Sequence, residues 1–246
     1  MTELAGKVAL VTGGSRGIGA AIAERLARDG ADVAVTYTSS ADRAAEVVRR
    51  IEAAGRRGLA LAADSADPVA LIGAVERVVA GLGGLDILVN NAGIAPYGPF
   101  EQVAVEEVDR ALAVHARAAF VAAQAAAPHL EGGGRIIGIG SNLAERLPYP
   151  GWTLYAMSKS ALIGLTKGLA RELGPRGVTV NLVQPGSTDT EMNPADSPDA
   201  DHERALTALG RYARAEEIAA TVAHLAGPAG AYITGTAITV DGGFAA

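Results

Sequence analysis

The sequence predicts a single α/β domain in which a doubly wound parallel sheet of about seven strands carries helices on both faces. Short apolar, β-branched segments alternate with longer helical segments almost from end to end of the 246 residues. The short segments are mostly apolar throughout, as expected of strands buried on both faces of a parallel sheet. No linker rich in proline and serine interrupts the alternation, so we expect residues 1–246 to form one domain.

The elements follow one another in a regular order that favours right-handed crossovers. The expected strands are 7–12, 32–37, 58–63, 85–90, 135–140, 178–183 and 236–240. The expected helices are 17–29, 40–54, 67–80, 105–127, 152–173 and 215–225. Residues 187–209 break this rhythm, because they are rich in Pro, Asp and Thr and too long for an ordinary connection. They are expected to form a lid over a substrate site.

The composition excludes several classes of protein. Hydrophobic residues make up 49% of the chain and charged residues 20%, which excludes a disordered chain. Without cysteine there is no disulfide framework, thiolate zinc site or catalytic thiol. His129, His202 and His224 are scattered without metal-ligand spacing, so no metal is expected. A net charge of −6 argues against nucleic acid as the main partner.

Neither a leader nor a membrane anchor is expected. The start of the chain lacks a basic segment followed by a long apolar run, so no signal peptide is visible. The most apolar stretch, 111–127, is interrupted by His115, Arg117 and Gln124 and is therefore no membrane span. We expect a cytoplasmic protein that has no membrane partner.

A glycine-rich segment, Thr12-Gly13-Gly14-Ser15-Arg16-Gly17-Ile18-Gly19, follows the first strand and opens the first helix. Gly13 lets the chain turn sharply, Gly17 leaves room for a pyrophosphate, and Gly19 allows close packing of helix and strand. The N–H groups and the positive dipole end of the helix would hold the phosphates. The segment therefore predicts a nucleotide-binding site.

The spacing Thr-Gly-x-x-x-Gly-x-Gly resembles that of the short-chain dehydrogenase/reductase family. Three further motifs extend the resemblance: Asn90-Asn91-Ala92-Gly93 after the fourth strand, Tyr155-x-x-x-Lys159 on a helix and Pro185-Gly186 after the sixth strand. The similarity covers essentially the whole chain and is closest to the 3-oxoacyl-(acyl-carrier-protein) reductase-like group. It implies a Rossmann-type domain that binds NAD(P) and transfers a hydride.

The end of the second strand indicates which dinucleotide binds. An NAD site usually has Asp or Glu there, whereas this chain reads Thr36-Tyr37-Thr38-Ser39-Ser40. Hydroxyls and a cation would hold a 2′-phosphate that a carboxylate would repel. Arg16, helped by Ser39 or Ser40, is the expected cation, unless it is a solvated surface arginine. NADPH (NADP+) is therefore the predicted cofactor.

The resemblance adds other contacts with the cofactor. Asp64 matches the family aspartate that meets the adenine, but it could instead cap the next helix. Thr188 through its backbone and Thr190 through its hydroxyl would hold the nicotinamide carboxamide. The remaining expected cofactor-binding residues are Gly13, Ser15, Gly17, Ile18, Gly19, Thr36, Ser65, Asn91, Ala92, Gly93, Tyr155, Lys159, Pro185 and Gly186.

Tyr155 and Lys159 are four residues apart in a helical segment, so they share one face. The ammonium should favour the tyrosinate and lower the pKa of Tyr155. Tyr155 could then give a proton to a carbonyl oxygen as hydride arrives, or take it back in the reverse reaction. In family members the lysine also bonds the nicotinamide ribose.

The family places a serine about 13 residues before this tyrosine to bond the substrate carbonyl. Counting back from Tyr155 gives Asn142, and Ser141 is one residue further. We expect Ser141 to hold the oxygen, with Asn142 as the alternative, since either side chain could donate.

His115 departs from the family pattern, since relatives carry asparagine there to complete a proton path to the lysine. An imidazole could donate and accept through its two nitrogens and so replace that relay, with added pH sensitivity. Alternatively His115 is a hydrogen-bonded core residue and the relay is altered.

The expected substrate wall comprises Tyr149, Trp152 and Met192, although Trp152 could equally pack against the lid. The leading hypothesis is an NADPH-dependent carbonyl reductase acting on a ketone such as a 3-oxoacyl thioester or another β-keto compound. The alternatives are a nucleotide-binding regulatory protein with reduced catalysis and an alcohol or sugar dehydrogenase working oxidatively. By resemblance we also expect a homotetramer or dimer built by pairing helices 105–127 and 152–173.

Overall fold

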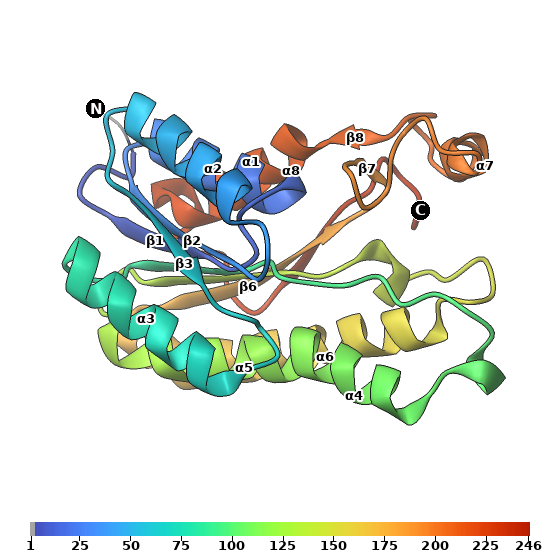
Figure 1. Ribbon diagram of the computed structural model, residues 1–246, viewed down its shortest axis with the longest axis horizontal. Coiled ribbons are helices and arrows are strands. Elements are labelled where there is room, and N and C mark those ends of the chain that lie inside the picture. Colours follow the sequence, from blue (N-terminus) through green and yellow to red (C-terminus); the bar gives the residue numbers. More distant parts are fainter. Residues whose placement is uncertain (1–2) are drawn as a thin grey trace.

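A seven-stranded parallel sheet in the order β3-β2-β1-β4-β5-β6-β9 forms the centre of the molecule (Figure 1). The computed structural model describes residues 3–246, so residues 1 and 2 of the expected domain lie outside the described part. Every expected strand is present, with ends that differ by a residue or two. The strands are β1 (Val8–Val11), β2 (Asp32–Tyr37), β3 (Gly58–Ala62), β4 (Ile87–Asn90), β5 (Arg135–Ile139), β6 (Thr179–Pro185) and β9 (Ala237–Val240).

Helices cover both faces of this sheet, which confirms the doubly wound α/β fold (Figure 1). One face carries α1 (Gly17–Arg28), α2 (Ala41–Ala53) and α8 (Ala215–Ala226). The other face carries α3 (Pro68–Leu82), α4 (Val105–Leu112), α5 (Ala118–Ala126) and α6 (Thr153–Leu173). Short 3-10 turns occur at Phe100–Gln102, Ala127–His129, Asn142–Ala144, Gly174–Arg176 and Pro228–Gly230.

Local sequence signals set several helix boundaries. The Asp67 carboxylate accepts from the N–H groups of Val69 and Ala70, and Pro68 occupies the first turn of α3. These contacts satisfy donors that have no partner within the helix. Gly83, at φ +90°, ends the same helix in a conformation that favours glycine. The sequence therefore defines both ends of α3.

The expected helix 105–127 is not regular. A π-helical segment, Ala113–Arg117, separates α4 from α5. In a π-helix each hydrogen bond spans five residues instead of the four of an α-helix, and such segments are frequent at functional sites. His115 lies within this segment and is buried. The apolar periodicity on either side conceals the irregularity in the sequence.

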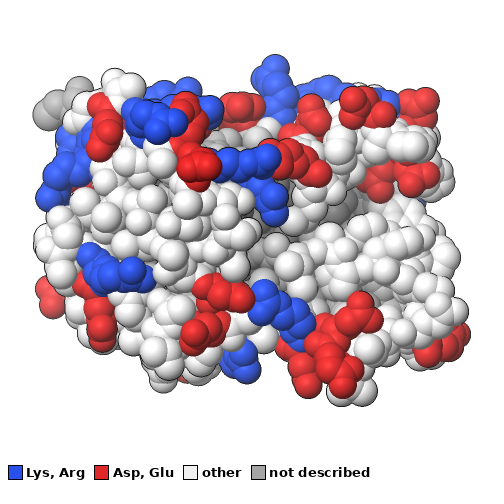
Figure 2. All heavy atoms as spheres, viewed as in Figure 1, with Lys and Arg blue, Asp and Glu red and all other residues white. Residues whose placement is uncertain are grey.

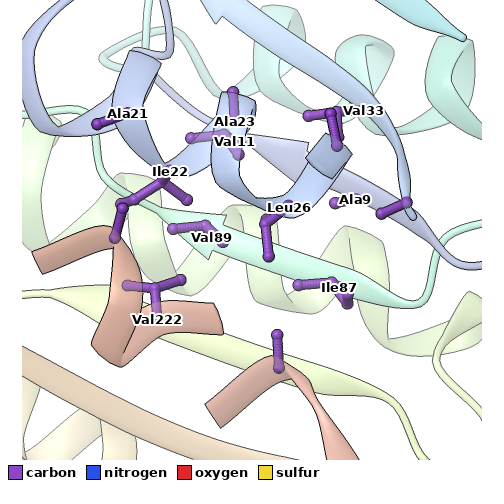
Figure 3. Packing of buried hydrophobic residues seen from close by; sticks show 14 of the residues in the cluster. Ala9, Val11, Ala21, Ile22, Ala23, Leu26, Val33, Ile87, Val89 and Val222 are labelled. Atoms are coloured by element: carbon purple, nitrogen blue, oxygen red, sulfur yellow. The ribbon is translucent and has the colours of Figure 1, made fainter. Parts of the chain in front are cut away.

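The largest core cluster fills the space between the sheet and helices α1 and α8 (Figure 3). Ile22 and Leu26 of α1 pack on Val11 of β1 and Val89 of β4, and none of these side chains is more than marginally exposed. Burial of this kind is the main favourable contribution to folding. It fixes α1 against the central strands and so positions the helix N-terminus above the sheet edge.

The lid expected at 187–209 contains regular structure rather than loop alone. It includes β7 (Thr188–Asp189) and α7 (Ala200–Ala205), and β7 pairs with β8 (Ala213–Arg214) outside the main sheet. These elements lie beyond the end of β6 (Figure 1). In residues 3–246 no helix combines the length and apolar character needed to cross a bilayer.

The packing of α1 can be tested by truncating its central side chain. Leu26→Ala should lower the free energy of unfolding by about 2–5 kcal/mol, because it leaves a cavity against the sheet. Urea denaturation followed by circular dichroism measures the change. Val69→Ala, at a side chain that is 76% exposed, is the control and should alter stability by less than about 0.5 kcal/mol. Equal losses in the two variants would contradict the described core.

Candidate active site

A cavity of about 530 Å³ lies at the carboxyl ends of the strands, where the strand order reverses between β1 and β4. This reversal is where doubly wound sheets bind ligands. The loops after β1, β2, β4, β5 and β6 line the cavity together with the lid. The expected residues found in its wall are Gly13, Ser15, Arg16, Gly17, Ile18, Gly19, Ser39, Ser40, Asp64, Ser65, Asn91, Ala92, Gly93, Ser141, Asn142, Tyr149, Trp152, Tyr155, Lys159, Pro185, Gly186, Thr188, Thr190 and Met192.

The glycine loop fits closely against the loop after β4. A Cβ added at Gly13, which has φ +62°, would lie 2.9 Å from Ala92 Cα, and one at Gly19 would lie 2.4 Å from Asn91 Nδ2. The Asn91 amide donates to the carbonyls of Thr12 (2.9 Å) and Gly13 (3.1 Å). No side chain could be accommodated at either glycine without moving this backbone.

The N-terminus of α1 faces the cavity with its first backbone N–H groups. No side chain caps the helix and its first turn contains no acid. Its first N–H groups have no partner within the helix, and they form the positive end of the helix dipole. This arrangement suits a phosphate group.

Thr36, expected among the cofactor-binding residues, lies inside the sheet and not in the cavity wall. It is buried, its Oγ1 accepts from the Gly13 N–H at 3.0 Å, and it does not line the cavity. Thr36 therefore holds the glycine loop in place from inside the sheet. Position at the end of β2 cannot by itself distinguish these two orientations.

The end of β2 offers hydroxyl groups and no carboxylate, as expected. Ser39 and Ser40 line the cavity beside Arg16, whose side chain is 57% exposed. Arg16 Nη1 lies 3.7 Å from a carboxylate oxygen of Glu191 in the lid, and Arg43 of α2 donates to both oxygens of that carboxylate. The sequence gives no sign of Arg43 and Glu191, because no motif pairs a lid residue with α2.

Asp64 lines the cavity but does not cap α3, a role that Asp67 performs. Its carboxylate accepts from the N–H of Ala66 at 2.9 Å and pairs with Arg110 at 3.1 Å. The bond from the Ala66 N–H, followed by Arg110, lowers the pKa of Asp64 below its usual value. Asp64 is therefore held in place as a carboxylate at the cavity wall.

Tyr155 and Lys159 lie one turn apart on α6, and both face the cavity. The Tyr155 ring is held edge-on by Trp152, with centroids 5.5 Å apart, and by His115, at 5.9 Å. Lys159 Nζ donates to the Ile139 carbonyl at 2.9 Å and lies 5.9 Å from the centre of the Tyr155 ring. The two side chains are thus fixed by neighbours from three different segments.

The expected lowering of the Tyr155 pKa is wrong for this structure. Burial raises the pKa of Tyr155, and a hydrogen bond with the Ser141 side chain only partly opposes it. Burial also lowers the pKa of Lys159 to about 8. Removal from water favours the neutral form of both groups, and it is the main cause of both shifts.

Ser141 and Asn142 are both buried at the end of β5 and both line the cavity. Ser141 lies near enough to Tyr155 for its side chain to lower the pKa of that phenol, and its Oγ accepts from the Leu143 N–H at 3.2 Å. These contacts favour Ser141 over Asn142 as the group that holds a substrate oxygen next to Tyr155.

His115 lies behind the cavity wall with both ring nitrogens bonded. Nε2 accepts from the Ile94 N–H at 3.0 Å, so Nδ1 carries the proton and donates to Ser158 Oγ at 2.8 Å. Ser158 in turn donates to the Tyr155 carbonyl at 2.8 Å. Burial, assisted by the charge of Lys159, lowers the pKa of His115 to about 3. The geometry favours a neutral, satisfied core histidine over a pH-sensitive relay.

The substrate side of the cavity is aromatic and contains lid acids. Tyr149 Oη donates to Glu203 of α7 at 3.0 Å, and burial raises the pKa of Tyr149. Trp152 packs on Tyr97, with ring centroids 5.1 Å apart. Met192, from the lid, lines the cavity and is 57% exposed. Tyr97 and Glu203 cannot be identified from the sequence, because they are distant from every motif.

Comparison with known proteins decides the family. The profile of the family described as Enoyl-(Acyl carrier protein) reductase, adh_short_C2, matches residues 13–245. The chain belongs to the short-chain dehydrogenase/reductase family. The motifs that carried the resemblance are the segments that converge on the cavity.

Several members of the short-chain dehydrogenase/reductase family resemble this chain along its full length. A short-chain dehydrogenase from Burkholderia cenocepacia in complex with NADP is 60% identical, covers 99% of this chain and 100% of its own, and has a TM-score of 0.98. A blue fluorescent protein from a metagenomic library, in complex with NADPH, is 54% identical with the same coverage and TM-score. The cyclic-di-GMP-binding biofilm dispersal mediator protein of Escherichia coli is 44% identical over 100% of both chains.

The buried, neutral state of His115 predicts a pH dependence of stability. The unfolded chain binds a proton on this residue near pH 6.5 and the folded chain only near pH 3, so stability falls as the pH drops between these values. From about pH 7 to pH 5, wild-type protein should lose about 2 kcal/mol more unfolding free energy than His115→Asn.

Urea denaturation at the two pH values measures this difference. His224→Asn, at an exposed residue of α8, is the control and should keep the wild-type pH dependence. If His115→Asn were as acid-sensitive as wild type, His115 would not be neutral in the folded protein.

Proposed function

We propose that the protein is an NADP(H)-dependent carbonyl reductase that transfers a hydride to a ketone. The observation that carries this proposal is the convergence of Ser141, Tyr155 and Lys159 on the same cavity as the glycine loop and Arg16. A phosphate-binding end and a proton-donating end within one cavity suit a dinucleotide laid across the sheet edge.

The residues present fit NADP(H). The uncapped N-terminus of α1 suits the pyrophosphate, and the close approach at Gly13 and Gly19 shapes its cradle. Arg16, Ser39 and Ser40 provide a cation and hydroxyls suited to the 2′-phosphate. Two relatives, 60% and 54% identical, have structures with NADP and NADPH, which supports the same cofactor here. When bound, NADPH would supply the hydride.

The protein's own residues handle the substrate oxygen and the proton. Ser141 donates a hydrogen bond to the carbonyl oxygen, and Tyr155 Oη delivers the proton to it. Trp152 and His115 contact the Tyr155 ring edge-to-face and so keep its hydroxyl directed into the cavity. Lys159, buried with its ammonium against the Ile139 carbonyl, supplies positive charge beside the phenol.

A β-keto compound, such as a 3-oxoacyl thioester, is the substrate class that we propose. The walls formed by Tyr149, Trp152 and Met192 suit an acyl chain. Asp199 and Glu203 also line this side of the cavity, so the part of the substrate held here should be uncharged. The matching family carries the description Enoyl-(Acyl carrier protein) reductase, so a β-keto thioester and its enoyl counterpart should be compared directly.

A second candidate function is regulatory binding of a nucleotide. The Escherichia coli relative is named for binding cyclic-di-GMP, which supports this candidate. The intact pair of Tyr155 and Lys159 counts against it, since a binding protein has no need of a proton donor in the cavity. An oxidative role on alcohols or sugars would use the same side chains in reverse.

We also propose that α4–α5 and α6 pair between subunits of a tetramer or dimer. Val105, Phe120 and Met157 on these helices are 70%, 52% and 47% exposed, so these helices offer apolar surface that pairing would bury. Sedimentation equilibrium tests the pairing, because a monomer at micromolar concentration would contradict it.

Tyr155→Phe removes the hydroxyl that delivers the proton and leaves the ring in place. NADPH-dependent ketone reduction should fall by about 10²–10⁴-fold. Fluorescence titration should give an NADPH affinity within a few-fold of wild type. Loss of cofactor binding in this variant would contradict the division of roles along the cavity.

Arg16→Ala should distinguish the two cofactors. Loss of a charged partner should weaken NADPH binding by about tenfold to a hundredfold and NADH binding much less, because NADH has no 2′-phosphate. Arg28→Ala, at an arginine of α1 that is 58% exposed, is the matched control. Equal weakening of both cofactors would mean that Arg16 does not hold the phosphate.

A further inference from the structure

The lid is tied to helix α2 through one carboxylate at the ribose end of the cavity. Glu191 follows Thr190 in the lid and lines the cavity close to Arg16. Arg43, near the start of α2, donates to both of its oxygens, and Arg16 Nη1 lies 3.7 Å from one of them. Glu191 therefore connects the lid, the glycine loop and α2, which are far apart in sequence.

Arg16 lines the cavity together with Ser39 and Ser40, where a 2′-phosphate would be held, and Arg43 lies in the first turn of α2, directly after these serines. The two guanidinium groups, chiefly that of Arg43, lower the pKa of Glu191, so its carboxylate is ionised at neutral pH. A phosphate seated on Arg16 would lie beside this negative charge and be repelled by it, weakly because the site is open to water. The carboxylate and the phosphate would therefore compete for the two guanidinium groups.

The contact is weak enough to be exchanged. The side chains of Arg16, Arg43 and Glu191 are 57%, 50% and 56% exposed, and ion pairs in water contribute little to stability. A phosphate brings more charge and more acceptor oxygens than a carboxylate does. The exposure of all three side chains also leaves Glu191 free to turn outward into solvent.

We propose that Glu191 is a specificity-determining residue that competes with the cofactor 2′-phosphate for Arg16 and Arg43, so that the phosphate releases the lid from α2. This inference rests on the proposed use of NADP(H) and assigns Arg43 as a second partner of the phosphate. A ligand without the 2′-phosphate leaves the tie between Glu191 and the two arginines in place. By linkage, loosening the tie must favour the phosphate by the same factor.

Two small probes isolate the 2′-phosphate. Adenosine 2′,5′-bisphosphate and adenosine 5′-monophosphate differ by that group alone, and neither carries a nicotinamide that could touch the lid. Isothermal titration should show that Glu191→Gln binds the bisphosphate about two- to fivefold more tightly than wild type. Its affinity for the monophosphate should be unchanged.

Glu46→Gln is the matched control. Like Glu191, Glu46 is about half exposed (43%) and pairs with two arginines, Arg49 and Arg50. It lies on α2 and does not line the cavity. This variant should keep the wild-type affinity for both probes. Arg43→Ala should weaken binding of the bisphosphate and leave binding of the monophosphate unchanged.

Hydrogen exchange of the lid provides a readout that needs no catalysis. In wild type, the bisphosphate should raise amide exchange over residues 188–197 relative to the monophosphate. In Glu191→Gln, exchange there should already be raised without ligand and should respond equally to both probes. Glu46→Gln should behave like wild type.

The outcomes separate this inference from the proposed function. If wild type prefers the bisphosphate but Glu191→Gln changes neither its affinity nor lid exchange, the competition is refuted and the NADP(H) assignment stands. If wild type does not prefer the bisphosphate over the monophosphate, the 2′-phosphate site and this inference both fail.

Discussion

The close approach of the glycine loop to the loop after β4 is the constraint on which the site depends. A Cβ at Gly13 would lie 2.9 Å from Ala92 Cα, and the Asn91 amide bonds the carbonyls of Thr12 and Gly13. Buried packing of α1 on β1 and β4 fixes the helix that follows the first loop. Together these contacts place an uncapped helix N-terminus at the strand reversal, where a dinucleotide phosphate can be received.

The two ends of the cavity differ in how far their charged and titratable side chains are buried. At the reacting end burial raises the pKa of Tyr155 and lowers that of His115, so both rings stay neutral, and it lowers the pKa of Lys159 to about 8, which leaves the ammonium mostly protonated at neutral pH. A phenol that keeps its proton is a suitable donor to a developing alkoxide. At the ribose end the arginines stay exposed and exchangeable, which suits recognition of a charged group.

Much of the fold and the motif residues could be predicted from sequence, because buried parallel strands are continuously apolar and the glycine and Tyr-x-x-x-Lys spacings are local. The rest depended on tertiary contacts. Thr36 faces the glycine loop because of the strand's orientation in the sheet, and His115 is satisfied by the Ile94 N–H and Ser158. The partners Arg43 and Glu191 are 148 residues apart, a separation at which sequence periodicity carries no information.

The most direct test of the reductase assignment is steady-state oxidation of NADPH and NADH by the purified protein, with β-keto esters, simple ketones and quinones as acceptors. The structure predicts turnover of an uncharged ketone with clear preference for NADPH. Tight binding of NADPH without reduction of any carbonyl compound would contradict the assignment and favour a nucleotide-binding regulator on the same fold.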